Sequence, residues 1–240
     1  MARRSLLYVP LCLALASLAA CGPEPVPAGT MSVKNGAKKP YLPAWKLPSE
    51  EKIPGKADEY DDYRAAHPEL YALTVAPGKP GFRALVEWEP MQALLLSYSG
   101  YEKGILAQMV KSSIDVTDIY IIVETSTLKT EMTNAIKAAG VAQAKIDSKV
   151  HFLTYPNDSI WMIDFAPVPL VGPDKTIAFA DFRYYHDRVN DDALPARLAD
   201  LWGLTDFRVG MDYEGGNFQM DEVGTCYYSQ GTFWENADKT

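Results

Sequence analysis

The stretch NDSIWMIDFAPVPLV, residues 157–171, places two carboxylates among apolar residues. It reads as a buried strand and the turn leading into it, with Asp158 in the turn and Asp164 between Ile163 and Phe165, near Trp161. A buried charge is costly unless a partner satisfies it. An ionised carboxylate accepts hydrogen bonds through two oxygens, so the first question about this sequence is which donors meet Asp164.

Further polar residues follow expected strands. They are Arg183, His186, Arg188, Glu214 and Asn217. Each alone is more often a turn former, a helix cap or part of a solvated loop. In α/β proteins, however, ligands bind at loops that follow the carboxyl ends of strands, so the combination indicates a candidate site.

The elements that must position these residues alternate along the chain. We expect strands at 91–98, 118–124, 149–155, 167–172, 176–184 and 207–211, and helices at 101–115, 126–140 and 193–203. Ser126 is an expected N-cap and Gly140 an expected C-cap. The strand–helix–strand alternation predicts α/β architecture with parallel neighbouring strands.

The first 20 residues have the pattern of a signal peptide. Arg3 and Arg4 precede a short apolar stretch, Leu6–Leu18, and the sequence L-A-A-C ends at Cys21. This order resembles a bacterial lipobox, which implies lipidation of Cys21 and anchoring to a membrane surface. Gly22, rather than Asp, at the next position favours the outer membrane in a Gram-negative host. An ordinary cleavage site with an incidental cysteine is the alternative.

Residues 21–81 read as a proline-rich tether and linker, because ten of the 17 prolines lie between positions 22 and 81. One short helix is expected at Glu59–Ala66, and residues 82–240 form the main domain. After removal of the signal and lipidation of Cys21, Cys226 is the remaining cysteine. Its alternating surroundings predict a buried, unreactive side chain in a strand.

The charge balance bears on partners. A net charge of −8, with interspersed cations, argues against nucleic acid as the ligand. The three histidines are far apart in sequence and no cysteine pairs occur, so no metal site or cofactor is expected.

Four motifs occur in order: EWEP (87–90), DSIWMIDFAP (158–167), DFRYYHDRVNDD (181–192) and EGGNFQMD (214–221). Together they resemble the bacterial (Porphyromonas-type) peptidylarginine deiminase and agmatine deiminase family of guanidino-group modifying enzymes. The resemblance spans roughly residues 85–230. It implies a pentein-type α/β propeller, of which this chain would hold about the first half, and hydrolysis of a guanidinium to a ureido group and ammonia.

The resemblance also implies roles for the site residues. Asp164 would clamp the substrate guanidinium, whose planar fork of N–H donors matches a carboxylate. Arg188 would grip a substrate carboxylate, which favours peptidyl-arginine or free arginine-like substrates over agmatine. Trp161 would help to wall the pocket, and Asp158 would shape its loop. The turn that carries Glu214, Gly215 and Asn217 would line it.

Several departures from the family pattern matter. Ile163 replaces the family's arginine, Ala166 its glycine, and His186 its first carboxylate-binding arginine. No histidine begins an H-x-D motif, and Cys226 lies too close to E-G-G-N to be the family's nucleophile.

Two function classes therefore stay open: part of a lipid-anchored deiminase, or a partial pentein that binds guanidino groups without turnover. A glycosidase-like pair of carboxylates is a third, for which the other motifs have no use. Because half a propeller leaves apolar faces uncovered, a homodimer is a further expectation.

Overall fold

The computed structural model describes residues 42–74 and 81–237, all within one unit, Lys38–Thr240. The expected signal segment and Cys21 lie outside the described residues. No helix in the described part of the chain is long and apolar enough to cross a membrane.

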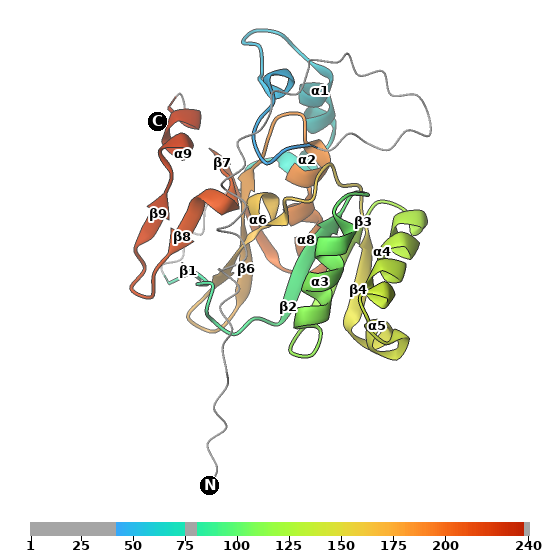
Figure 1. The fold of residues 1–240 in the computed structure, drawn as a ribbon. Helices are drawn as coiled ribbons and strands as arrows, with labels where there is room; N and C mark the ends of the chain where they lie inside the picture. The colour runs from blue at the N-terminus through green and yellow to red at the C-terminus, as the bar shows by residue number, and fades with distance from the viewer. Residues whose placement is uncertain (1–41, 75–80, 238–240) are drawn as a thin grey trace. The chain divides into compact units, whose positions relative to one another are not determined.

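One sheet is entirely parallel, as expected from the strand–helix–strand pattern. Its strands are β2 (Ala93–Tyr98), β3 (Asp118–Val123) and β4 (Val150–Thr154), in that order. The connections are α3 (Lys103–Ser113), α4 (Ser126–Ala138) and α5 (Gln143–Lys149). Figure 1 shows α3 and α4 beside this sheet. The sequence pattern missed α5, which has a single buried residue, Ile146, and so lacks an apolar stripe.

The central strand β3 faces two cores because strand side chains alternate between the faces of a sheet. Ile119, Ile121 and Val123 pack with residues of α3 and α4, whereas Ile122 belongs to the second core. The expected N-cap of α4 was wrong by one residue: Thr125 Oγ1 accepts the Leu128 N–H at 3.2 Å. Gly140, just after that helix, has a φ of 98°, a conformation that favours glycine.

The second sheet is mixed. It contains β1 (Arg83–Ala84), β5 (Val168–Val171), β6 (Ile177–Arg183) and β7 (Thr205–Asp212), in that order. Strands β6 and β7 are parallel, with a register shift at Phe182/Arg183, and the other pairs are antiparallel. Both this sheet and the parallel one are open, and the described residues form no closed propeller.

The second core joins the two sheets. It includes Ile122 of β3, Phe179 of β6, and Leu198 of α8 (Leu194–Trp202). Met162 and Phe165 enter it from α6 (Met162–Phe165), a one-turn helix where the sequence predicted the approach to a strand. This core therefore fixes the position of the helix that carries Asp164.

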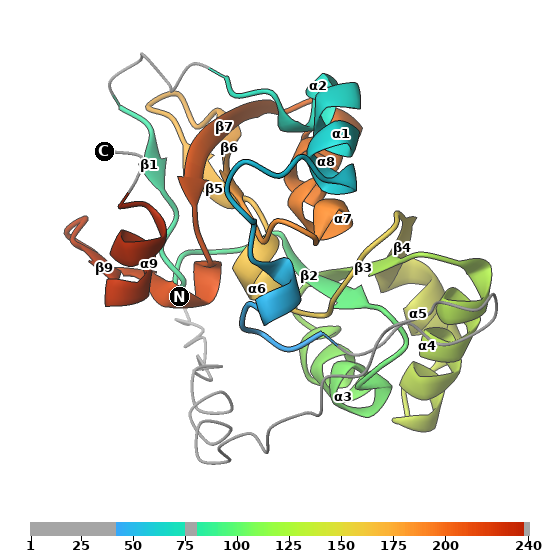
Figure 2. The ribbon, with the colours of Figure 1, turned by 90° about the horizontal axis from the view of Figure 1, so that it is seen from above.

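The N-terminal described segment packs on the same unit. It holds the 3-10 turn η2 (Pro48–Glu50) and the helices α1 (Glu59–Ala66) and α2 (Pro68–Tyr71). Helices α1 and α2 lie beside α7 (Val189–Asp192) and α8 (Figure 2), and Tyr71 Oη donates to the Val189 carbonyl at 2.7 Å. The helix at Glu59–Ala66 is confirmed, but Leu42–Glu50 is not a loose tether, because Glu50 is buried against Arg188.

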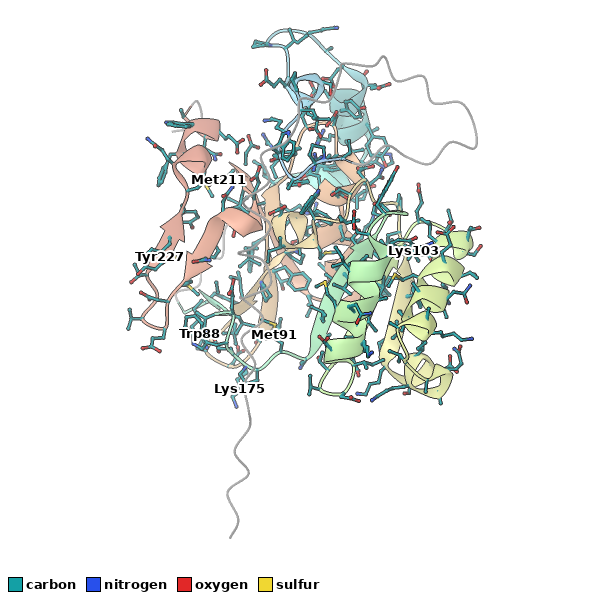
Figure 3. The ribbon with its side chains drawn as sticks, in the orientation of Figure 1. Trp88, Met91, Lys103, Lys175, Met211 and Tyr227 are labelled. Carbon is teal, nitrogen blue, oxygen red and sulfur yellow. The ribbon has the colours of Figure 1, made fainter. Side chains whose placement is uncertain are left out.

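The C-terminal described residues form the hairpin of β8 (Phe218–Met220) and β9 (Cys226–Tyr228), followed by α9 (Gln230–Glu235). Cys226 is exposed, so its expected burial was wrong: β9 is a hairpin strand whose three residues are all exposed. Trp88, Met91 and Tyr227 are exposed apolar or aromatic side chains (Figure 3). A homodimer that covers such side chains stays a prediction.

Candidate functional site

Helix α6 turns Asp164 inward. The Asp164 N–H donates to the Trp161 carbonyl at 2.9 Å, and the Ala166 N–H to the Met162 carbonyl at 2.9 Å. Since Met162 and Phe165 enter the second core, this turn leaves the Asp164 side chain buried. Ile163, the residue before Asp164, is by contrast 60% exposed.

The Asp164 carboxylate has few donors for a buried charge. Oδ1 accepts the Gly216 N–H at 3.1 Å. Burial raises the pKa of Asp164 to about 6, while that hydrogen bond and the Arg188 guanidinium oppose the rise. When ionised, the Asp164 carboxylate can accept further hydrogen bonds from a cationic donor.

Glu214 is a second carboxylate near Asp164. Its Oε2 accepts from Asn217 Nδ2 at 2.7 Å, and its Oε1 from the Tyr185 hydroxyl. Burial raises the pKa of Glu214 to about 7; nearby Glu235 and Asp164 add to the rise, and Lys46 opposes it. Asp164 and Glu214 thus lie near enough for the charge of Asp164 to raise the pKa of Glu214.

The glycine pair between Glu214 and Asn217 permits this closeness. It lies in the 3-10 turn η3 (Gly215–Asn217), which packs on α6. A Cβ atom on Gly215 would lie 1.9 Å from the Ile163 carbonyl oxygen, and one on Gly216 would lie 2.5 Å from Asp164 Oδ1. The absence of a side chain at Gly215 therefore allows the backbone of η3 to lie close to the backbone of α6.

Asp158 holds the loop that leads into α6. Its Oδ2 accepts the Asn190 N–H at 2.8 Å and its Oδ1 accepts from Asn190 Nδ2 at 2.9 Å. In return, Asp191 Oδ1 accepts the Asp158 N–H at 2.8 Å, and Asp191 Oδ2 accepts the Ser159 hydroxyl at 2.7 Å. These hydrogen bonds in both directions attach the loop before α6 to α7. Asp158 therefore has a positioning role.

Arg188 is fully buried, and each nitrogen of its guanidinium donates a hydrogen bond within the chain. Its partners are Glu50, the Tyr184 hydroxyl and the carbonyls of Pro43 and Trp45. Its guanidinium also lies 4.7 Å from the centre of the Tyr185 ring. The Arg188 charge opposes the rise in the pKa of Asp164, but Arg188 is already bound to the carboxylate of Glu50.

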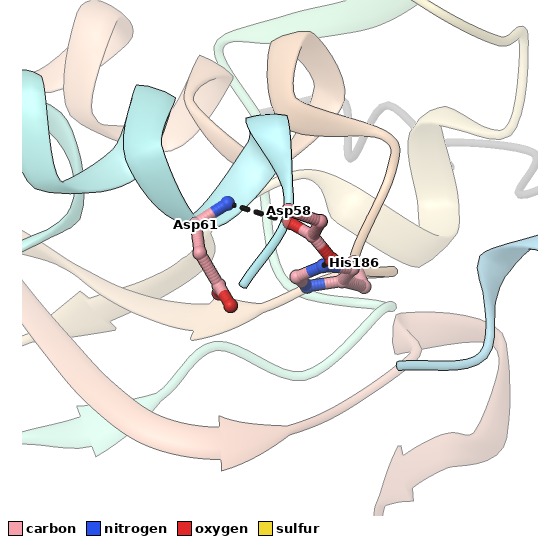
Figure 4. Close-up of side chains that lie close together, drawn as sticks. All are labelled: Asp58, Asp61 and His186. Carbon is pink, nitrogen blue, oxygen red and sulfur yellow. Dashed lines mark hydrogen bonds and ion pairs between the residues drawn. The ribbon is translucent and has the colours of Figure 1, made fainter. Parts of the chain in front are cut away.

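His186 faces the N-terminal helix. Its Nε2 lies 2.7 Å from Asp58 Oδ2, and Asp58 Oδ1 accepts the Asp61 N–H at 2.9 Å (Figure 4). Ligand atoms of Asp58, Asp61 and His186 lie within 4.8 Å of one another, as a metal ion would require. However, Asp58 Oδ1 already caps α1, and Asp58 Oδ2 already binds His186. The cluster is therefore explained by its role in attaching α1 to the loop that carries His186.

A cavity of about 530 Å³ lies next to this cluster. Tyr185 and Tyr213 line it, together with Lys46 of the N-terminal segment and His186. Tyr185 also donates to Glu214, so this one side chain both lines the cavity and contacts a carboxylate of the site.

Sequence reasoning missed the contribution of residues 42–50. The Trp161 indole N–H donates to the Leu42 carbonyl at 2.9 Å, and the Tyr185 hydroxyl oxygen, whose one proton is donated to Glu214, lies 3.2 Å from the Ala44 carbonyl oxygen. The signal that could have found this contribution is the charge of Arg188, because an arginine between folded elements needs a carboxylate partner.

Residues 83–238 match the model of the Porphyromonas-type peptidyl-arginine deiminase family. The chain belongs to this family. The match contains Asp164, Arg188 and the Glu214–Asn217 turn, whereas residues 42–50, which contact Trp161 and Arg188, lie outside it.

Two solved structures resemble this member of the peptidyl-arginine deiminase family in fold. The agmatine deiminase of C. jejuni has a TM-score of 0.50 and 17% identity, over 62% of this chain and 46% of that one. The agmatine deiminase of Enterococcus faecalis has a TM-score of 0.54 and 16% identity, over 65% of this chain and 46% of that one. The matched region is thus less than half the length of either structure.

Proposed function

We propose that this chain provides the guanidinium-binding part of a deiminase that acts on peptidyl-arginine or agmatine-like substrates. The reaction adds water to the guanidino carbon and breaks one C–N bond, so that a guanidinium and water give a ureido group and ammonium. The observation that carries the proposal is the buried Asp164 carboxylate near Glu214. It is supported by the membership of the chain in the Porphyromonas-type peptidyl-arginine deiminase family.

The two carboxylates suit a guanidinium chemically. A guanidinium stays charged and presents N–H donors in a rigid plane, which carboxylate oxygens accept in charge-assisted hydrogen bonds. Burial keeps Asp164 and Glu214 partly protonated near neutral pH. A bound cation favours the ionised forms, so binding is expected to release protons and to strengthen as the pH rises through 6–7.

Hydrolysis also needs a nucleophile and a proton donor. Within the 240 residues, none of His67, His151 and His186 begins an H-x-D motif, and Cys226 lies exposed in the hairpin. We therefore assign guanidinium binding, and no step of the hydrolysis, to the residues described above. The alternative, a binding module without catalysis, predicts no ureido product from a protein expressed from the complete reading frame.

Calorimetric titration of the chain tests the binding function. Agmatine and N-acetyl-arginine amide are expected to bind, whereas citrulline is not, because its ureido group has no charge. Affinity for the two guanidines is expected to rise about tenfold from pH 5.5 to pH 8, as Asp164 and Glu214 ionise. Equal binding of citrulline, or no binding of either guanidine, would refute the proposal.

We also propose that the protein is exported and anchored to a membrane through a lipid on Cys21, on the strength of the L-A-A-C motif. Cys21→Ala is expected to move the protein from the membrane fraction to the soluble fraction, with Cys226→Ala as the control that keeps the anchor. Recovery of Cys21→Ala in the membrane fraction would contradict lipidation at this position.

A further inference from the structure

The cavity of about 530 Å³ is bounded by the N-terminal helices and by two parallel strands of the mixed sheet. Helices α1 and α2 contribute Arg64, Ala65 and Tyr71 to its wall, and β6 and β7 contribute Asp181 and Arg208. Ligand cavities in proteins have volumes of about 300–1,000 Å³, so this cavity has room for a small organic molecule.

Asp181 is a buried carboxylate in the wall of this cavity. Its side chain is 6% exposed, and among the described residues it accepts no hydrogen bond. Arg208 is its register partner on β7, but Arg208 Nε lies 4.0 Å from Asp181 Oδ2 and donates to Asp206 Oδ2 at 2.8 Å. Since buried polar groups are normally hydrogen-bonded, Asp181 offers unused acceptor atoms to a ligand in the cavity.

Other charged side chains of the cavity wall have closer partners. Arg64 Nη2 donates to Asp192 Oδ2 at 3.0 Å, and Lys52 Nζ lies 2.8 Å from Asp61 Oδ2. The Arg208 charge is likewise taken up by Asp206. The buried charge that is left without a close counterion is therefore negative, which favours a cationic ligand over an anionic one.

The charges that face Asp181 disfavour its ionised form in the empty cavity. Burial raises the pKa of Asp181 well above its usual value, and the nearby carboxylates of Asp206 and Asp192 add to the rise. Arg208 opposes it, and Arg64 is occupied by Asp192. A cation that binds beside Asp181 favours the ionised carboxylate, so its binding releases a proton.

The composition of the wall favours an organic cation over a metal ion. Hard metal ions need several oxygen ligands, and among the described residues Asp181 belongs to no group of three or more potential metal ligands. The wall also includes the apolar and aromatic side chains of Leu70, Tyr71, Phe182 and Val209. These side chains suit the hydrocarbon part of a ligand, and aromatic rings attract an ammonium group.

We propose that this cavity is a second ligand site, in which Asp181 binds the ammonium group of a small organic amine. The ammonium N–H groups donate to the carboxylate, and the apolar wall contacts the hydrocarbon part of the amine. The inference does not rest on the proposed function, because Asp181 builds this site and Asp164 and Glu214 build the other. A bound amine contacts both the N-terminal helices and the mixed sheet, so it is expected to stabilise the folded chain.

The probes are 2-phenylethylamine and 2-phenylethanol, which share a shape and differ in the charge of the terminal group. In calorimetric titrations at pH 7, the unmodified chain is expected to bind the amine at least about tenfold more tightly than the alcohol. Asp181→Asn is expected to remove this preference. Asp62→Asn is the matched control, because Asp62 is exposed on α1 and lies outside the cavity wall, and it is expected to keep the preference.

Equal binding of the amine and the alcohol by the unmodified chain would overturn the inference. Full amine binding by Asp181→Asn, together with its loss in Asp164→Asn, would also overturn it, because the amine would then occupy the guanidinium site. The proposed function is decided separately by N-acetyl-arginine amide, which carries no ammonium group.

Proton release gives a second readout, which a merely structural role of Asp181 would not produce. Titrations with the amine in phosphate and in Tris buffer, which take up protons with different enthalpies, are expected to give different heats for the unmodified chain. Equal heats in the two buffers would overturn the inference.

A variant that leaves every charge in place covers the case in which Asp181→Asn does not fold. Ala65 is exposed and lines the cavity, so Ala65→Trp fills part of the ligand volume. This variant is expected to lose most of the binding of 2-phenylethylamine. Undiminished amine binding by Ala65→Trp would overturn the inference, because the amine would then lie outside the cavity.

Discussion

Asp164→Asn is expected to stabilise the folded chain at pH 8 while it weakens guanidine binding about 100-fold, the loss typical of a charge-assisted contact. Burial raises the pKa of Asp164 from 3.8 to about 6. Between these values the folded state holds a proton that the unfolded state has lost, so the free energy of unfolding falls as the pH rises. Above about pH 6 the ionised carboxylate costs the fold on the order of 2–3 kcal/mol.

Thermal melting and calorimetric titration with agmatine at pH 4 and pH 8 measure these two effects. The melting temperature of Asp164→Asn is expected to exceed that of the unmodified chain by several degrees at pH 8 and to equal it at pH 4. Asp62→Asn, the same change at an exposed position, is expected to alter neither property. A lower melting temperature at pH 8, or undiminished binding, would show that Asp164 serves the fold and not the ligand.

The elements with strong periodicity could be predicted from the sequence. Strands β2, β3 and β4 and helices α3 and α4 each present an apolar face to a core, and this spacing is visible in the residues. The place of Asp164 could be predicted only in part. The sequence marks it as a buried carboxylate, but the four residues of α6 are too few to show a helical period.

The partner of Arg188 could not be predicted, because the contact joins residues 138 positions apart. Proline-rich composition made Leu42–Glu50 look like a tether, yet its carbonyl groups accept hydrogen bonds from Trp161 and Arg188. Proline lacks an N–H donor but keeps its carbonyl acceptor. The composition of a proline-rich segment therefore predicts its backbone conformation but not which side chains its carbonyl groups bind.

Gly215→Ala is expected to destabilise the chain by about 3 kcal/mol or more, at the severe end of overpacking substitutions. The new Cβ would lie 1.9 Å from the Ile163 carbonyl oxygen and 3.8 Å from Asp164 Cα, so a backbone must move. Gly104→Ala is the matched control, because nothing lies within 4 Å of its Cβ position. There alanine is expected to be neutral or to stabilise α3 by about 0.5–1 kcal/mol.

The displacement expected for Gly215→Ala would act on the site as well as on stability. The Ile163 carbonyl belongs to the same turn as Asp164, and the next residue, Gly216, gives Asp164 its hydrogen bond at 3.1 Å. Urea unfolding measures the stability change, and agmatine titration of the protein that remains folded measures the site. Wild-type affinity in a destabilised Gly215→Ala variant would show that η3 supports the fold alone. A joint loss would show that the turn positions Asp164 for its ligand.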